Sequence, residues 1–171
     1  MKNYIKRNAL PLLITLTLII TLSLGWTPQP EAPVVLFALA SALFDPGREG
    51  FLDGTIDWDT DDIRAMLVLN TYTFNAANKF ITDIGAVDNG RSAALAGKTV
   101  TSGVADANDT SLTATAASAS NAIIVFKHTG ADATARLIAY IDTATGLPFT
   151  PGAGQTVNIA WDNGANKIFK L

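Results

Sequence analysis

Ala122-Ile-Ile-Val-Phe126 and Leu137-Ile-Ala-Tyr-Ile141 are the stretches of sequence that decide the fold. Both runs are apolar without alternation, and each is short enough to be a strand and too short to be a typical helix. Strands of this kind are covered on both faces, by a second sheet, a helix or another subunit. We therefore expect these two runs to form the centre of a sheet.

Weaker candidate strands surround this centre. Ile63–Leu69 alternates, but its second face contains Met66 and Val68, so both of its sides should also be covered. Further short runs at 91–96, 98–102 and 111–116 are separated by residues that favour turns. This pattern predicts a mainly β domain, an antiparallel β-sandwich or a partly closed barrel. The Ala, Ser and Thr content of 110–121 alternatively fits a flexible loop.

The end of the chain predicts a final β-hairpin. Residues 155–161 alternate, with Val157, Ile159 and Trp161 on one face. Asn163-Gly164 supplies the residues that a tight hairpin turn prefers, and 167–171 can return as the closing strand.

One or two short helices are expected before and after the first long strand. Asp45 is a suitable N-cap with Pro46 at the first helical position, and Gly54 would end this helix. Its buried side would consist of Phe44, Phe51 and Leu52. Residues 75–84 predict a helical turn or two over an end of the sheet.

Size and composition allow one domain of this kind plus a short appendage. The chain has 171 residues, 49% of them hydrophobic, and no Cys, which excludes disulfides and thiolate metal sites. The first forty residues carry a charge of +2 and the others −5, which together give the net charge of −3. An acidic body lacks the basic surface that binds phosphates, so direct nucleic-acid binding is not expected.

Residues 1–39 form an apolar N-terminal segment, and residues 40–171 the single β-rich domain. Lys2, Lys6 and Arg7 precede the apolar run Leu10–Leu24, and a Pro-rich linker follows at 27–33. This layout is that of an export signal or membrane anchor, although the run is short for a membrane span. Alternatively, the gene start is over-extended and translation begins at position 39, or the segment is an arm that packs on a neighbouring subunit. Membrane contact is expected only if residues 1–25 are retained.

Candidate sites for chemistry are few. Asp57, Asp59 and Asp61 imitate the start of a calcium loop, but Asp62 and Val68 occupy the positions that require Gly and Glu. A solvated turn is therefore preferred there, and also for the second acidic turn at 106–109. The only His, His128, lies in a predicted turn without a metal-ligand pattern and is read as a surface residue. No catalytic residue, metal or cofactor is expected.

Three aromatic residues are the candidate interface positions. Trp58, Trp161 and Tyr140 could contact a partner or line a sugar-binding face, although aromatic residues in a sheet of this size are more often core.

Three longer strings carry a family resemblance. They are Pro46-Gly-Arg-Glu-Gly-Phe-Leu-Asp-Gly-Thr-Ile-Asp-Trp58, Arg136-Leu-Ile-Ala-Tyr-Ile-Asp-Thr-Ala-Thr-Gly-Leu-Pro148 and the C-terminal segment 161–171. Over residues 40–171 the chain resembles a family of small structural proteins encoded by tailed bacteriophages. The resemblance implies a non-enzymatic virion protein, a capsid decoration or tail-associated component. Its partners would be other virion proteins, and it would form a homo-oligomer.

An alternative of another class also accommodates the N-terminal segment. The chain could be an exported or membrane-tethered β-sandwich domain that binds carbohydrate or a protein. In that case it would be secreted or membrane-anchored, and not located in a virion.

Overall fold

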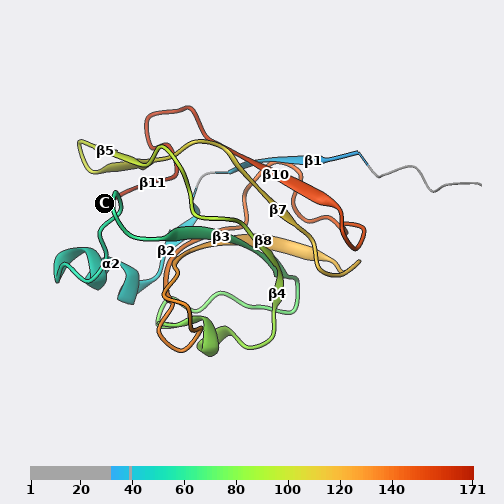
Figure 1. Cartoon of the computed structure of the whole chain (residues 1–171), viewed down its shortest axis with the longest axis horizontal. Helices are drawn as coiled ribbons and strands as arrows, with labels where there is room; N and C mark the ends of the chain where they lie inside the picture. The colour runs from blue at the N-terminus through green and yellow to red at the C-terminus, as the bar shows by residue number, and fades with distance from the viewer. Residues whose placement is uncertain (1–31, 39) are drawn as a thin grey trace, which may run out of the picture. The chain divides into compact units, whose positions relative to one another are not determined.

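The computed structural model describes residues 32–38 and 40–171, which belong to one compact unit that begins at Glu31. This unit is mainly β, as predicted, and its strands form three sheets that do not close into a barrel (Figure 1). The five-stranded sheet has the order β2 (Ala42–Leu43), β9 (Arg136–Ile141), β8 (Ser120–Lys127), β3 (Ile63–Leu69) and β4 (Asp88–Arg91). A three-stranded sheet contains β1 (Val34–Ala38), β10 (Thr156–Trp161) and β7 (Thr110–Thr113), and a smaller one contains β11 (Phe169–Lys170), β6 (Val104–Asp106) and β5 (Thr99–Thr101).

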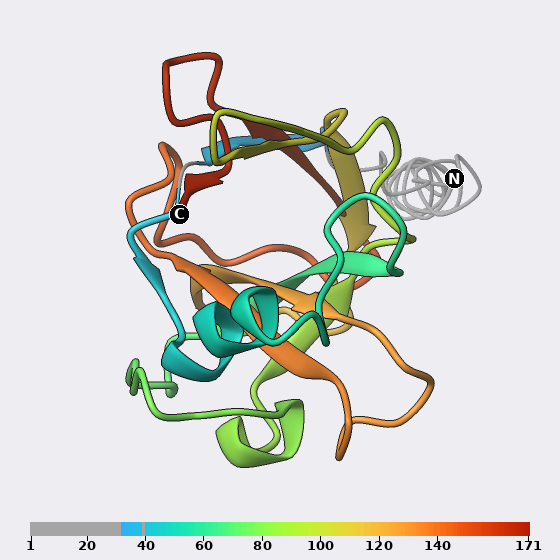
Figure 2. The same cartoon turned by 90° about the vertical axis from the view of Figure 1, so that its left-hand side faces the viewer.

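The sheets make two layers, with the five-stranded sheet in one and the two smaller sheets in the other (Figure 2). The apolar runs around Ile124 and Ile138 are β8 and β9, and they lie inside the large sheet as predicted. β3 pairs antiparallel with β8 over its whole length. The fold is therefore a β-sandwich-like arrangement built around these three strands.

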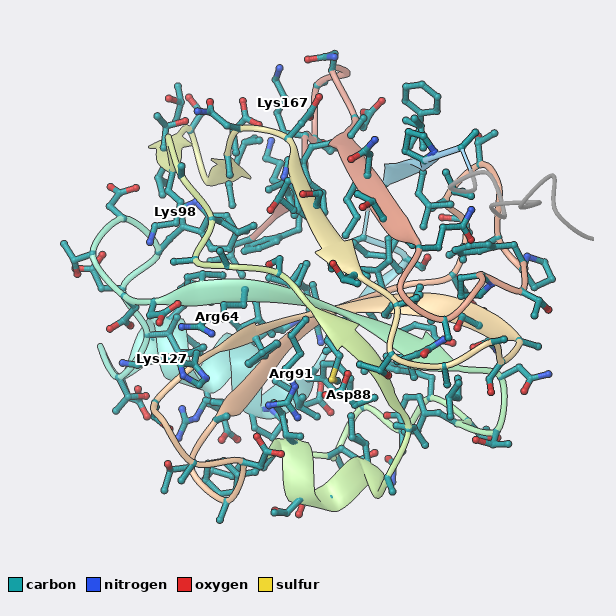
Figure 3. All side chains as sticks on the ribbon, turned by 45° about the vertical axis from the view of Figure 1, so that its right-hand side comes forward. Arg64, Asp88, Arg91, Lys98, Lys127 and Lys167 are labelled. Atoms are coloured by element: carbon teal, nitrogen blue, oxygen red, sulfur yellow. The ribbon has the colours of Figure 1, made fainter. Side chains whose placement is uncertain are left out.

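The two layers are joined along one side where β4 meets β7. An isolated bridge pairs Ser92 with Leu112, and the Ser92 hydroxyl accepts a hydrogen bond from the backbone N–H of Ala65. Arg91 and Asp88 lie side by side on β4 and form an ion pair (Figure 3). Arg91 also makes two hydrogen bonds to Asp132, which ties the β8–β9 loop to this edge.

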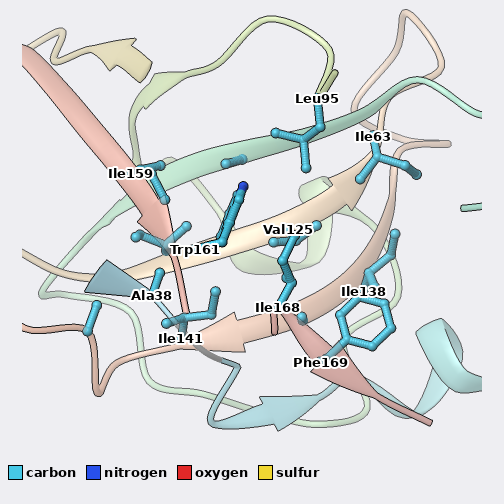
Figure 4. Packing of buried hydrophobic residues seen from close by; sticks show 14 of the residues in the cluster. Ala38, Ile63, Leu95, Val125, Ile138, Ile141, Ile159, Trp161, Ile168 and Phe169 are labelled. Carbon is cyan, nitrogen blue, oxygen red and sulfur yellow. The ribbon is translucent and has the colours of Figure 1, made fainter. Parts of the chain in front are cut away.

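The main core lies between the layers. Ile63, Val125 and Ile141 from the large sheet face Ile159 and Trp161 from β10 (Figure 4). All five side chains are at most 3% exposed. Their alternation along β10 is the one that the sequence predicts.

A second core covers the outer face of the large sheet. Met66, Ile124 and Phe126 point to this side and are fully buried. The covering segment includes the 3₁₀ helix η1 (Ile81–Ile84), whose two Ile side chains are buried against the sheet. The large sheet is therefore covered on both faces, as its unalternating strands predict.

β1 corrects the predicted domain boundary. The sequence analysis assigned Val34–Ala38 to the N-terminal segment, but β1 pairs in parallel with β10 and buries Leu36 and Ala38 completely. Val34–Ala38 is apolar at every position, so the alternation of its buried and exposed side chains does not show in the residue types. The signal, anchor and arm interpretations concern residues 1–31, which lie outside the described residues. Within residues 32–38 and 40–171, no helix is both long and apolar enough to cross a membrane.

The predicted final hairpin is wrong. Both edges of β10 are occupied, by β1 and by β7, so the last strand cannot pair with it. The chain instead turns away after Trp161, and β11 pairs with β6 in the small sheet. In the turn, Gly164 donates its N–H to the Asp162 carboxylate, and the positive φ belongs to Lys167.

The helix α2 (Asp45–Leu52) differs from its prediction in its cap and in part of its buried side. Phe44 is the N-cap, Asp45 is the first helical residue, and Leu52 is 89% exposed. Pro46, Gly47 and Gly50 are the buried positions of the helix. A Cβ atom at Gly47 would lie 2.8 Å from the Leu137 carbonyl oxygen. Small residues therefore let the helix backbone approach β9 closely. Phe44 is buried as predicted and Phe51 packs partly buried against the main core, whereas Leu52 points outward.

Of the weaker predicted strands, 98–102 corresponds to β5 and 111–116 to β7, whereas residues 92–96 form no strand. The strand β6 was not predicted. Residues 110–113 are a strand, so the flexible-loop alternative is wrong for them. Val104–Asp106 contains an acid and follows Gly103 directly, which is why the sequence pattern missed it.

Candidate functional site

An apolar groove lies at the end of the molecule where α2 meets the C-terminal strand. Its volume is about 300 Å³, and Figure 2 views this end of the fold. The lining comes from α2, the loop that follows it, the small sheet and the last residue. The lining residues are Phe51, Gly54, Ile56, Asp57, Trp58, Val100, Gly103, Ala105, Phe169 and Leu171.

Three aromatic rings form the inner wall of the groove. The Phe169 ring lies edge-on to Trp58 with 5.1 Å between centroids, and the Phe51 ring is tilted against Phe169 at 5.7 Å. Trp58 is only 3% exposed, and its indole Nε1 donates a hydrogen bond of 3.0 Å to the Asp106 carbonyl. This bond satisfies the one polar atom of the side chain, so the wall is rigid and apolar.

The rim of the groove is apolar too. Val100 on β5 is 51% exposed and Leu171 is 56% exposed. Val100 is on an edge strand, because β5 has only β6 as a neighbour. Single exposed apolar residues are ordinary, but several around one groove mark a surface for interaction.

One carboxylate interrupts this apolar surface. Asp57 lines the groove, and its Oδ1 accepts hydrogen bonds from the backbone N–H groups of Asp59 and Thr60. Hydrogen bonding to Thr60 is the main cause that lowers the pKa of Asp57, so it is anionic at neutral pH. The groove can therefore accommodate apolar side chains with a polar or cationic group at one end.

The three predicted interface residues are not brought together. Trp161 is 3% exposed in the main core, and its indole N–H donates to the Asn108 carbonyl. Tyr140 is in the second core, where its ring stacks on Phe74 at 4.8 Å. Burial raises the pKa of Tyr140. Of the three, Trp58 alone lines the groove.

Sequence reasoning missed the other groove residues. Phe51, Val100, Phe169 and Leu171 are far apart along the chain, and β11 was expected to pair elsewhere.

The acidic turn before β3 is held by its own hydrogen bonds. Asp61 accepts the backbone N–H of Asp57 and pairs with Lys127 at 2.8 Å, while Asp62 pairs with Arg64. These contacts use the carboxylates within the protein, as in the turn that the sequence analysis preferred. Within the described part of the chain, no three His, Cys, Asp or Glu side chains gather as a metal site would require.

His128 is more enclosed than a surface residue. Its ring lies edge-on to Phe126, and its Nδ1 atom is buried without a hydrogen-bond partner. Its nearest acidic groups, Asp62 and Asp132, are both paired with arginines.

A second surface is the outer face of the sheet that contains β1. Phe37 and Val35 on the edge strand are 59% and 46% exposed. A shallow hollow of about 540 Å³ lies beside them, and it is more polar than the groove. Its lining residues are Val35, Asp109, Thr110, Ser111, Asn158, Ile159 and Ala160.

The groove and the hollow come from different strands, so the molecule has two distinct surfaces through which it can contact other molecules. Neither surface combines a nucleophile with a hydrogen-bonded base among the contacts described above. Comparisons with protein-family models, with curated proteins and with solved structures found no match to this chain.

Proposed function

We propose that this protein is a non-enzymatic structural component of a tailed-phage particle, a capsid decoration or tail-associated protein that acts by packing against neighbouring subunits. The observation that carries the proposal is the apolar groove, whose rim residues Val100 and Leu171 are more than half exposed in the isolated chain. The resemblance over residues 40–171 supports the assignment to a virion.

The occupant that we propose for the groove is a second copy of the chain. The groove and the outer face of β1 are different surfaces, so a contact from one to the other is head-to-tail. Contacts of this type generate rings or extended arrays of identical subunits. Phe37 and Val35 form an exposed apolar surface on β1, an edge strand without charged residues. The apolar groove can bind such a surface.

Charge substitutions at two matched positions test this packing. Val100 and Val35 are the same residue type, both on edge strands and about half exposed. Val100→Lys and Val35→Lys should each dissociate the oligomer, as measured by light scattering coupled to size-exclusion chromatography. Thr73→Lys, an exposed position in the segment between β3 and η1 that belongs to neither surface, is the control that should leave the mass unchanged. A wild-type chain that is monomeric at high concentration would contradict self-packing.

Location tests the virion assignment independently. Peptide mass spectrometry should find the protein in DNA-containing particles and not in membranes or soluble secretions. The same peptides give the first residue of the mature chain. Recovery only from membranes or secretions would refute the virion assignment.

A second function is favoured by the hollow beside β1. Its Asn158, Ser111 and Asp109 side chains offer hydrogen bonds, and Phe37 presents an exposed ring. Sugars are bound by this combination of polar groups and an aromatic surface. An exported carbohydrate-binding domain is therefore the alternative, and a glycan array with Phe37→Ala as the matched variant distinguishes it from the packing proposal.

A further inference from the structure

The triplet Asp-Asn-Gly occurs twice in this chain, at 88–90 and at 162–164. In both copies the backbone N–H of the glycine donates a hydrogen bond to the preceding aspartate, at 2.7 Å for Gly90 and 2.9 Å for Gly164. The local geometry is thus shared. The surroundings of the two asparagines are not.

Asn89 is fully buried, and its amide is held on both sides. Its Nδ2 donates to the Ser120 hydroxyl and the Ser118 carbonyl, and its Oδ1 accepts from the Ala116 N–H and the Thr115 hydroxyl. An amide with all of these bonds cannot rotate toward its own backbone.

Asn163 is exposed in the turn between β10 and β11. Its Oδ1 accepts a single long hydrogen bond of 3.5 Å, from Lys167 Nζ. Three groups therefore surround its amide carbon: the Gly164 nitrogen, the Asp162 carboxylate bound to the proton of that nitrogen, and the Lys167 ammonium beside the amide oxygen.

We propose that Asn163 is a self-modification site, where the Gly164 nitrogen attacks the Asn163 side-chain carbon to form a cyclic imide. The N–Cγ bond forms, the Cγ–Nδ2 bond breaks, and ammonia leaves. The proton of the Gly164 N–H passes through the Asp162 carboxylate to the departing nitrogen. Water then opens the ring at either carbonyl and gives aspartate or isoaspartate, so no oxidant or reductant is required.

Each neighbour has a defined task in this reaction. Gly164 has no Cβ to obstruct the attack. Asp162 is a general base that already accepts the proton in question, and Lys167 stabilises negative charge on the amide oxygen as the ring forms. Lys167 is also 3.7 Å from Asp106, which keeps the ammonium at this turn.

The product changes the turn that leads into β11. A new carboxylate competes with Asp106 for Lys167, and isoaspartate adds one methylene to the backbone before Ile168. Because Phe169 and Leu171 line the groove, modification at 163 alters the strand that presents them. This inference does not depend on the proposed function, since it concerns the chemistry of the turn.

Peptide mapping of the full chain after incubation at mildly alkaline pH tests the proposal. The peptide with Asn163 should lose ammonia and then gain water, with isoaspartate as the major product, and hydroxylamine should cleave the intermediate between Asn163 and Gly164. The peptide with Asn89 is the internal control and should be unchanged. Equal conversion of both asparagines, or none at Asn163, would overturn the proposal.

Two variants test the assigned roles. Asp162→Ala and Lys167→Gln should each slow the loss of ammonia several-fold, and Asp162→Ala should make its rate rise more steeply with pH because hydroxide must replace the carboxylate. Both positions are partly exposed in a turn, so the variants should fold. If both variants react at the wild-type rate, the neighbouring groups have no role and the self-catalysed mechanism is wrong.

Discussion

Asn89 joins segments that no strand pairing joins. Its side chain holds residues 115–120, which connect β7 in one layer to β8 in the other. Because Asn89 is completely buried, its amide depends on these protein partners, and the bond to the Ser120 hydroxyl is itself buried. Loss of the amide would leave the Ala116 N–H and the Ser120 hydroxyl without this partner.

We expect Asn89→Ala to lower the free energy of unfolding by about 2–4 kcal/mol, because buried groups lose their hydrogen bonds. Asn163→Ala, in the second copy of the same triplet, should change it by less than about 0.5 kcal/mol. Urea denaturation followed by tryptophan fluorescence measures both. Similar losses for the two variants would contradict the bonding role of Asn89.

Two features of position 90 require glycine: its backbone conformation and the atoms that surround it. Its φ is 122°, and a Cβ would lie 2.3 Å from the Thr113 carbonyl oxygen, which is backbone and cannot turn aside. Gly54 also has a positive φ, of 75°, but open space around it. We therefore expect Gly90→Ala to cost at least about 2 kcal/mol more than Gly54→Ala, measured as the difference in their unfolding free energies.

The two faces of β1 lie in different environments, the core and the outer surface. Leu36 is fully buried between the layers, whereas its neighbour Val35 is 46% exposed on the outer face. The loop after β9 covers part of the strand's free edge, where the Thr145 N–H donates to the Phe37 carbonyl. Covering an edge in this way limits unwanted strand pairing.

Leu36→Ala should destabilise the fold by about 2–5 kcal/mol, and Val35→Ala by less than about 1 kcal/mol. A chain that starts at position 39, the over-extended-gene interpretation, lacks β1 entirely and should be less stable than Leu36→Ala. Thermal unfolding of these three proteins and wild type measures the order. A 39–171 chain as stable as wild type would show that β1 is dispensable and would support the later start.

Strands with an unbroken apolar run of residues could be predicted from the sequence. A strand whose partner depends on which edges other strands occupy could not. β3, β8 and β9 follow from their apolar residues, because no alternative burial suits such runs. The residues before and within the last strand favour a hairpin with β10. However, β1 and β7 pair with both edges of β10, so the last strand pairs with β6 instead. A sequence pattern shows which face of a strand is buried. It does not show whether the edge of a possible partner strand is already paired.

The candidate site was predictable only at Trp58. An aromatic residue signals burial or contact, and the choice between them depends on what packs around it. For Trp161 the surroundings are two sheets, and for Trp58 they include a groove whose other side is the C-terminal residue. The groove is a product of chain segments more than a hundred residues apart, so no local pattern contains it.

The molecule as a whole should lose stability in acid. Hydrogen bonds from Arg91 lower the pKa of Asp132, those from Arg64 lower the pKa of Asp62, and backbone N–H groups of Phe80 and Lys79 lower the pKa of Asp83. Each folded carboxylate binds its proton at lower pH than in the unfolded chain. Its contribution is therefore fully present above the unfolded pKa of about 3.9 and is lost as pH falls through the lowered folded value.

We expect the melting temperature to be nearly constant from about pH 7 to about pH 5 and to fall steeply below about pH 4. Asp132→Asn should lower the melting temperature at neutral pH and reduce the steepness of its decline in acid. Scanning calorimetry over this range measures both effects. A melting temperature that rose on acidification would show that the ionised carboxylates destabilise the fold.

The parallel pairing of β1 with β10 also has a consequence in time. Val34 and Val157 are partners, yet about 120 residues separate them in the chain. At about 5–20 residues per second, ribosomal synthesis reaches β10 roughly 6–24 seconds after β1 has been made. Throughout that interval Leu36 and Phe37 are without their native neighbours on β10, and all five strands of the large sheet are made before β1 can dock. Of the strands in residues 32–38 and 40–171, β1 is therefore synthesised first and is among the last to be placed.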